Sequence, residues 1–309
     1  MNPKSAENAI WLIAGPTASG KSTLALRLAE ATGAQILNAD SMQVYRDLRI
    51  LTARPSVEDE VRAPHHLYGV ADGAERWSVG RWLAAASEAL SDIAARGRTA
   101  IVVGGTGLYF RALTRGLADV PAIPAEVRAQ VQTSFDSLGE TAFRERLAAV
   151  DPEAATRISP GDRQRLTRAL EVFDGTGRSL SRWQAQTKAP VVEWSGVVLA
   201  PPRAELYARI DARMAAMMES GASQEVERLL ARKLDAALPV MKALGVAGLA
   251  GQLRGDLTPA QALAQAQTAT RQYAKRQMTW FEHQTPDWPR VADAGDVEGV
   301  RALLQGAAP

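Results

Sequence analysis

The chain has 309 residues with 36 basic and 34 acidic side chains, so its formal charge is only +2, although the basic residues comprise 30 Arg against 6 Lys. Hydrophobic residues at 46% and charged residues at 23% are ordinary proportions for a globular protein, which argues against wholesale disorder and against a fibrous architecture. The absence of Cys excludes disulfides, thiolate catalysis and Cys-ligated zinc or iron–sulfur sites.

The pattern of apolar residues predicts alternating strands and helices in the first third of the chain. The N-terminal apolar run is too short for a signal peptide and no later run reaches the ~18 residues of a membrane span, so we expect a cytoplasmic protein with no membrane partner. A strand, helix, strand, helix and strand are predicted, in chain order, over 9–14, 22–31, 34–40, 79–96 and 99–105. Because strands separated by helices are typical of parallel sheets, the sequence predicts an α/β fold.

The remainder of the chain is predicted to be mainly helical. Pro121, Pro124 and Pro152 flank a helical stretch, which indicates an inserted helical subdomain. A fourth strand is predicted over 197–202, and Ala-rich helices follow from 203 to 280. The expected organisation is a catalytic core with C-terminal helices at 1–117 and 161–285, a helical insertion at 118–160, and a C-terminal tail at 286–309.

A phosphate-binding motif lies between the first strand and the first helix. The pattern G-x-x-x-x-G-K-[ST] is matched by Gly15, Pro16, Thr17, Ala18, Ser19, Gly20, Lys21 and Ser22. The glycines let the backbone wrap around a phosphate, and the amides at the helix N-terminus point at the anion. Lys21 would neutralise the phosphate, and the Ser22 hydroxyl would bind Mg²⁺, the cofactor that we expect. The motif predicts a P-loop NTPase-like fold and a diphosphate or polyphosphate ligand.

Asp40 is the carboxylate that we expect beside this loop. A P-loop NTPase normally needs a strand that ends in Asp to organise its metal, but the strand over 99–105 ends in Gly104-Gly105-Thr106-Gly107. Asp40 ends the strand over 34–40, where it could accept a proton from a nucleophile, or instead cap a helix or bind a metal indirectly. The segment around Thr106 could line a second substrate, or it could simply form a tight turn before a helix.

Two segments concentrate the arginines. Residues 157–182 carry six Arg against three acidic residues, a local charge of +3 that exceeds the +2 of the whole chain. Arg165 and Arg168 share one helix face, and residues 271–281 interleave basic with aromatic side chains. Either segment could be an amphipathic helix with a solvated face. Together with a diphosphate site, however, they favour a nucleic acid as the second substrate.

Six motifs, taken in order, resemble those of the bacterial tRNA dimethylallyltransferases, the isopentenyl-transferase enzymes of tRNA modification. They are GPTASGKS at 15–22, DSMQVY at 40–45, APHHL at 63–67, GGTGLYF at 104–110, DRQRLTRALEVF at 162–173 and RQYAKRQMTWF at 271–281. The resemblance implies transfer of a dimethylallyl group from dimethylallyl diphosphate to N6 of adenosine 37, which lies 3′ of the anticodon in tRNAs that read UNN codons. The products would be N6-(dimethylallyl)adenosine and diphosphate, and the partner would be the anticodon stem-loop of tRNA.

The resemblance also implies roles for individual residues. Asp40 would accept the N6 proton, Thr17 and Lys21 would act on the diphosphate within the loop from Gly15 to Ser22, and Arg209 would reach the same diphosphate. The implied tRNA-binding residues are Asp40, Ser41, Met42, Gln43, Thr106, Arg128, Gln164, Arg165, Leu166, Thr167, Arg168, Arg271, Lys275, Arg276 and Gln277. We expect a monomer.

Two positions depart from the family pattern, and two other functions are compatible with the motifs. Val246 follows Gly245 where the family usually has Tyr, and Leu51 stands where the family favours Gly.

One alternative function is a P-loop small-molecule kinase, in which Asp40 would activate a substrate hydroxyl. The other is a nucleotide-dependent RNA-binding switch without chemistry on the RNA. The two basic segments are too extensive for a small acceptor, which favours the transferase over the kinase.

Overall fold

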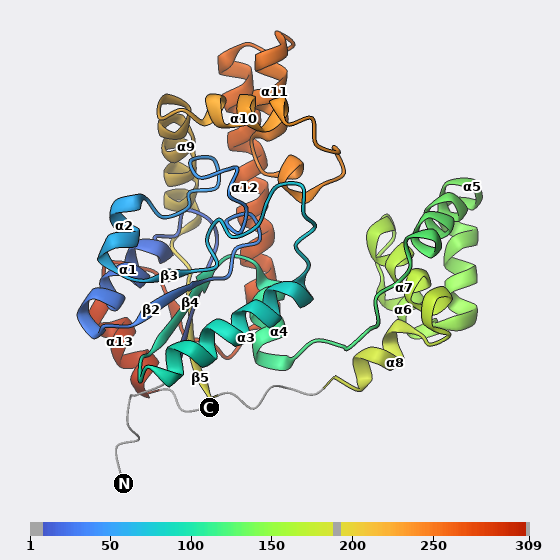
Figure 1. Cartoon of the computed structure of the whole chain (residues 1–309), viewed down its shortest axis with the longest axis horizontal. Coiled ribbons are helices and arrows are strands. Elements are labelled where there is room, and N and C mark those ends of the chain that lie inside the picture. Colours follow the sequence, from blue (N-terminus) through green and yellow to red (C-terminus); the bar gives the residue numbers. More distant parts are fainter. Residues whose placement is uncertain (1–8, 188–192, 307–309) are drawn as a thin grey trace. The chain divides into compact units, whose positions relative to one another are not determined.

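A computed structural model describes residues 9–187 and 193–306 of the chain (Figure 1). The parts of the predicted core and tail that fall on 1–8, 188–192 and 307–309 lie outside the described residues. The chain divides into two compact units. Unit 1 comprises Met1–Ala112 and Val191–Pro309, and unit 2 comprises Leu113–Pro190.

Unit 1 is built on a parallel sheet of six strands in the order β3-β2-β4-β1-β5-β6, which confirms the predicted α/β class. The strands are β1 (Ile10–Ala14), β2 (Gln35–Asn38), β3 (His65–His66), β4 (Ala100–Gly104), β5 (Trp194–Leu199) and β6 (Arg290–Val291). The central strand β1 is buried along its whole length and pairs with β4 and β5, with Leu12 opposite both Val102 and Gly196. β5 begins three residues before the predicted 197–202 and ends before Pro201.

Helices cover this sheet because parallel neighbours require crossover connections. They are α1 (Lys21–Thr32), α2 (Val57–Arg62), α3 (Val79–Ala95), α4 (Gly107–Arg115) and α13 (Val297–Gly306). Leu24 and Leu28 of α1 pack into one core cluster with Ile13 and with Val300 and Leu304 of α13. The C-terminal tail, for which the sequence predicted no element, therefore contributes both β6 and a core helix.

The C-terminal helices of unit 1 are α9 (Arg203–Glu219), α10 (Ala222–Ala231), the 3₁₀ helix η1 (Pro239–Lys242), α11 (Val246–Arg254) and α12 (Pro259–Gln284). The helical prediction for 203–280 is thereby confirmed. α12 begins with a capping box between Thr258 and Gln261, followed by Pro at its first position, a combination that is favourable at a helix start. α9 and α12 pack together through Leu206, Ile210 and Ala274 (Figure 1).

Unit 2 is helical, as the sequence predicted for the insertion, but it is longer than 118–160. It contains α5 (Ala125–Val150), α6 (Pro152–Arg157), α7 (Arg163–Thr176) and α8 (Leu180–Ala185). α5 is interrupted at Gly139, whose φ of 74° is not helical. Leu166 and Leu170 of α7 lie in the same core as Phe143 and Leu147 of α5, so α7 belongs to unit 2 and not to the catalytic core.

Within residues 9–187 and 193–306, no helix combines the length and the apolar character that crossing a bilayer would require.

Candidate active site

The phosphate loop connects the buried end of β1 to the start of α1. Gly20 has a φ of 90° and caps α1 without a side-chain hydrogen bond, so side chains leave the first amides of the helix available to an anion. Ala18 also lies in the left-handed region, at φ 63°. A Cβ atom on Gly15 would lie 2.9 Å from the Leu199 carbonyl oxygen, which explains why glycine is needed where the loop passes β5.

Lys21 lies inside this loop in a partly buried position. Its Nζ donates a hydrogen bond to the Pro16 carbonyl oxygen at 3.1 Å. Burial lowers the pKa of Lys21 to about 8; the negative charge of Asp40 opposes this shift, and the positive charge of Arg213 adds to it. At neutral pH the ammonium group is therefore charged but poorly solvated, which favours binding of an anionic ligand.

Asp40 lies two residues after the end of β2 and is held by its neighbours. Its backbone N–H donates to Asn38 Oδ1 at 2.8 Å, and its Oδ1 accepts from the Met42 N–H at 2.9 Å. Trp82 Nε1 in turn donates to the Asn38 carbonyl oxygen at 2.8 Å. Residues 41–44 form a turn, so Asp40 does not cap a helix there, and that alternative is removed.

The Gly-rich segment after β4 forms the tight turn that was one of its two predicted roles. A Cβ atom on Gly104 would lie 2.1 Å from the Ala39 carbonyl oxygen, and Tyr109 and Phe110 are buried in the core. The same turn also reaches the site, because the Thr106 Oγ1 accepts a hydrogen bond from the Ser41 N–H at 2.9 Å. Thr106 thus fixes the backbone that follows Asp40.

Gln277 joins the two loops from α12. Its Oε1 accepts from the Thr17 N–H at 2.8 Å, and its Nε2 donates to the Gly105 carbonyl oxygen at 2.8 Å. The side chain is 4% exposed. Both ends of the amide are therefore used within the protein, and Gln277 acts as a positioning residue for the phosphate loop, although the family pattern had placed it among the tRNA contacts.

The arginine that reaches the phosphate loop is Arg213 and not Arg209. Arg213 Nη2 donates to the Thr17 Oγ1 at 2.5 Å, and its buried Nε has no hydrogen-bond partner in the described part of the chain. Burial lowers the pKa of Arg213, and the nearby Asp40 opposes this shift. Arg209, one turn earlier on α9, pairs with Glu205 at 3.3 Å, and its side chain is 47% exposed. Arg213, rather than the expected Arg209, is therefore the arginine of α9 that contacts the phosphate loop in this structure.

Asp40, Thr17 and Arg213 line a pocket of about 290 Å³ within unit 1. Its polar lining includes Thr17, Asp40, Ser41 and Arg213, while Met42, Leu51, Met214, Met217, Ala243 and Leu244 give it an apolar wall. Tyr273 also lines the pocket, and burial raises the pKa of its hydroxyl, which therefore stays protonated. A pocket that combines an anion site, a carboxylate and an apolar wall is suited to a ligand with a charged head and a small hydrocarbon tail.

The residues of the site fit a magnesium ion that is bound mainly through a phosphate ligand. Ser22 lies exposed in the first turn of α1. Among the residues that the structure describes, no three or more His, Cys, Asp or Glu side chains come together as a metal-binding group. Mg²⁺ usually keeps several waters and shares its remaining ligands with substrate phosphates. The Ser22 hydroxyl is therefore a suitable single protein ligand.

The predicted tRNA-binding residues divide between the two units. In unit 1, Lys275 and Arg276 are exposed on α12 and line a shallow depression with Trp280, whereas Arg271 pairs with Asp211 at 2.5 Å. Gln43 donates to the backbone carbonyls of residues 52 and 53. In unit 2, the exposed members are Arg128, Gln164, Arg165 and Arg168.

Two of the predicted tRNA-binding residues in unit 2 are buried. Leu166 belongs to the core of the unit, and the Thr167 hydroxyl donates to the carbonyl oxygens of Arg163 and Gln164. Leu166 packs against α5 and Thr167 bonds back to its own helix, so the exposed arginines beside them are the groups available to a ligand.

Comparison with known proteins identifies the family. A family model described as IPP transferase matches residues 43–284, and a model described as isopentenyl transferase matches residues 8–72. The chain belongs to the IPP transferase family. It is 60% identical over 293 residues to a tRNA dimethylallyltransferase from Phenylobacterium zucineum (strain HLK1), with 95% of each chain covered. It is also 58% identical to a tRNA dimethylallyltransferase from Caulobacter sp. (strain K31), with 96% of each covered.

Solved structures of IPP transferases have the same fold. A tRNA isopentenylpyrophosphate transferase from Bacillus halodurans matches with a TM-score of 0.69 at 30% identity, covering 97% of this chain and 96% of that one. A eukaryotic dimethylallyltransferase acting on tRNA matches with a TM-score of 0.80 at 28% identity, covering 96% of this chain and 77% of that one. The resemblance inferred from the six motifs is thereby confirmed.

Proposed function

We propose that the protein transfers a dimethylallyl group from dimethylallyl diphosphate to N6 of adenosine 37 in tRNAs that read UNN codons. The observation that carries this proposal is that Asp40, Thr17 and Arg213 line the same pocket as a wall of Leu and Met side chains. The phosphate loop suits the diphosphate head, the apolar wall suits the prenyl tail, and Asp40, which lines the same pocket, would face the incoming base. A kinase that phosphorylates a polar acceptor would not require such a wall.

In the proposed reaction, the bond between C1 of the prenyl group and the bridging oxygen breaks, and its electron pair leaves with the diphosphate. The N6 lone pair forms the new bond to C1, and the N6 proton passes to the Asp40 carboxylate. Negative charge grows on the diphosphate in the transition state, where Lys21 and Arg213 are already in place. Such preorganised charges are often the largest contribution to catalysis.

Magnesium is the proposed cofactor. When bound, it would neutralise part of the charge on the diphosphate, and Ser22 would be its protein ligand. Lys21 and Arg213 would hold the other phosphate oxygens. Gln277 would keep the loop in shape through the Thr17 amide, which it already binds at 2.8 Å.

Transfer RNA is the proposed acceptor, bound through its anticodon stem-loop. Support comes from the exposed basic side chains of α12 and α7, Lys275, Arg276, Arg165 and Arg168, because phosphate contacts supply most of the affinity for nucleic acids. The guanidinium of Arg276 lies over the Tyr273 ring at 5.7 Å, so charge and aromatic surface occur together there. We also propose that the protein acts as a monomer and that it is located in the cytoplasm.

A donor assay tests this function. The protein is incubated with unmodified tRNA, Mg²⁺ and either radiolabelled dimethylallyl diphosphate or γ-labelled ATP. We expect label to move to tRNA only from the prenyl donor. Transfer from ATP alone would support a kinase instead, and nucleotide-dependent tRNA binding without any transfer would support an RNA-binding switch.

A further inference from the structure

Leu51 forms part of the apolar wall of the pocket on the side away from the phosphate loop. α9 runs along the pocket from Arg213, which binds Thr17 of the phosphate loop, to Met217. These two residues are four apart, so Met217 lies about 6 Å farther along the helix than Arg213. Beyond Met217, Gly221 follows the end of α9 and lies against the side chain of Ile50, the neighbour of Leu51. The wall formed by Leu51 therefore lies at the end of the pocket away from the phosphate loop, where the tail of a prenyl group bound by its diphosphate would point.

The Leu51 side chain is buried and packs closely against the backbone at Gly245. It is 6% exposed. A Cβ atom on Gly245 would lie 2.8 Å from Leu51 Cδ1, so the Leu51 side chain lies directly against the backbone at Gly245. Gly245 also has a φ of 91°, a conformation that favours glycine. Gly245 therefore packs directly behind the Leu51 side chain.

A buried carboxylate fixes the backbone at Leu51. Glu225 of α10 is 5% exposed, and its two oxygens accept hydrogen bonds from the backbone N–H groups of Arg49, Ile50 and Leu51 at 2.8–3.0 Å. Three consecutive amides on one carboxylate leave the loop little freedom, since hydrogen bonds to a charged group are stronger than neutral ones.

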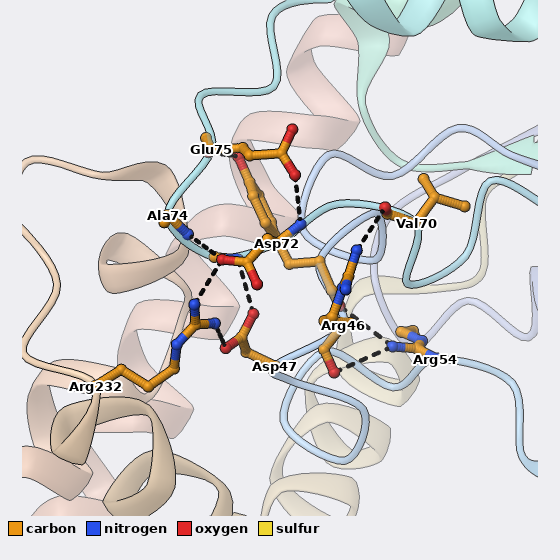
Figure 2. A network of polar contacts seen from close by, with 10 residues as sticks. Arg46, Asp47, Arg54, Val70, Asp72, Ala74, Glu75 and Arg232 are labelled. Atoms are coloured by element: carbon orange, nitrogen blue, oxygen red, sulfur yellow. Dashed lines mark hydrogen bonds and ion pairs between the residues drawn. The ribbon is translucent and has the colours of Figure 1, made fainter.

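A second polar network holds the same loop at residues before and after Leu51 in the sequence (Figure 2). Arg232 at the end of α10 pairs with Asp47 and, at 2.6 Å, with Asp72. Arg54 Nη1 donates to the backbone carbonyl oxygens of Tyr45 and Arg46, which closes the loop on itself. Leu51 therefore lies on a segment that is anchored before it, at it and after it.

We infer that Leu51 sets the upper length of the prenyl group that the enzyme accepts. The inference rests on the proposed function. A leucine side chain and one isoprene unit differ by a single carbon, so Leu51 occupies about the volume that a second isoprene unit would need. The five-carbon donor fits in front of Leu51, and the ten-carbon geranyl group is excluded by it.

The expected consequence is a change of donor when Leu51 is shortened. Geranyl transfer follows the same step: the C1–O bond breaks with its electrons leaving on the diphosphate, N6 bonds to C1, and the N6 proton passes to Asp40. For Leu51→Ala and Leu51→Gly, the ratio of kcat/KM for geranyl diphosphate to that for dimethylallyl diphosphate should rise roughly tenfold or more, since each methylene of pocket space discriminates by about that factor.

Ile50→Ala is the matched control. It removes a similar side chain from the same loop, but Ile50 packs against Gly221 and does not line the pocket, so the ratio should stay at the wild-type value. The inhibition constant of geranyl diphosphate against dimethylallyl transfer provides a second readout, and it should fall in the Leu51 variants only. If Leu51→Ala does not fold, as judged by thermal melting, Leu51→Val should shift both quantities in the same direction to a smaller extent.

The inference is overturned if a folded Leu51 variant transfers the dimethylallyl group and both quantities keep their wild-type values, or if the wild type already uses both donors equally well. Failure of the proposed function has a different signature, because the wild type would then transfer no dimethylallyl group to tRNA at all.

Discussion

The low pKa of Lys21 predicts that donor affinity depends on pH. Burial lowers this pKa to about 8, so the fraction of free enzyme with a charged Lys21 falls from about nine-tenths at pH 7 to about one-tenth at pH 9. If only the charged form binds dimethylallyl diphosphate, the apparent Kd rises about tenfold over this range, equivalent to about 1.4 kcal/mol. The phosphates themselves change little, because their last ionisation has a pKa near 6.

Titration calorimetry of dimethylallyl diphosphate in the presence of Mg²⁺ measures this effect without tRNA and therefore without turnover. Binding to the wild type at pH 9 should take up about one proton, because the bound anion restores the charge of Lys21. Lys21→Arg is the control, since arginine stays charged throughout this range. An affinity that is equal at pH 7 and pH 9, or that falls as steeply in Lys21→Arg, would refute the reasoning.

Three further predictions concern the rest of the protein. Arg213→Ala should lower kcat/KM for the donor about 10- to 100-fold through the loss of charge-assisted hydrogen bonds, whereas Arg209→Ala should change it less than about threefold in the same steady-state assay. Glu225→Gln should lower the free energy of unfolding by about 2–3 kcal/mol in urea titrations, because an amide NH₂ group would replace one carboxylate oxygen and face the backbone N–H groups that this oxygen accepts from. An unchanged urea midpoint would contradict the anchoring role. Replacing Arg165 and Arg168 together by Ala should reduce the salt slope of tRNA binding by about 1.5, and an unchanged slope would argue against phosphate contacts there.

The parts of the site that the sequence predicted are those encoded locally or by sheet topology. The loop from Gly15 to Ser22 combines a strand, a glycine pattern and a helix start in one segment. Asp40 could be placed beside it because the carboxyl ends of neighbouring parallel strands lie at one edge of the sheet. The structure has both features, with β2 and β1 on either side of β4.

The choice between Arg209 and Arg213 could not be made from the pattern. The two residues are four apart on α9, so they share one helix face, and any helical periodicity treats them alike. The difference arises from packing: Arg209 pairs with Glu205 on the exposed side of the helix, whereas Arg213 reaches Thr17 at the phosphate loop.

The apolar wall and the unit boundaries also lacked a local signal. Leu51, Met217 and Leu244 come from three distant segments that meet only in the folded unit 1. The pattern of α7 shows that one face is buried but not which helix covers it. Residues 161–176 were therefore predicted to belong to the catalytic core, whereas in the structure they pack on α5. β6 has only two residues, too few for any periodicity.

The most direct test of the central claim, that Asp40 accepts the proton as the prenyl group passes to N6, is nucleoside analysis of tRNA by mass spectrometry. Wild type and Asp40→Asn are each incubated with unmodified tRNA, Mg²⁺ and dimethylallyl diphosphate. The wild type should place N6-(dimethylallyl)adenosine at position 37, and Asp40→Asn should bind tRNA but leave it unmodified. Unmodified tRNA with the wild type, or a normal rate with Asp40→Asn, would contradict the account.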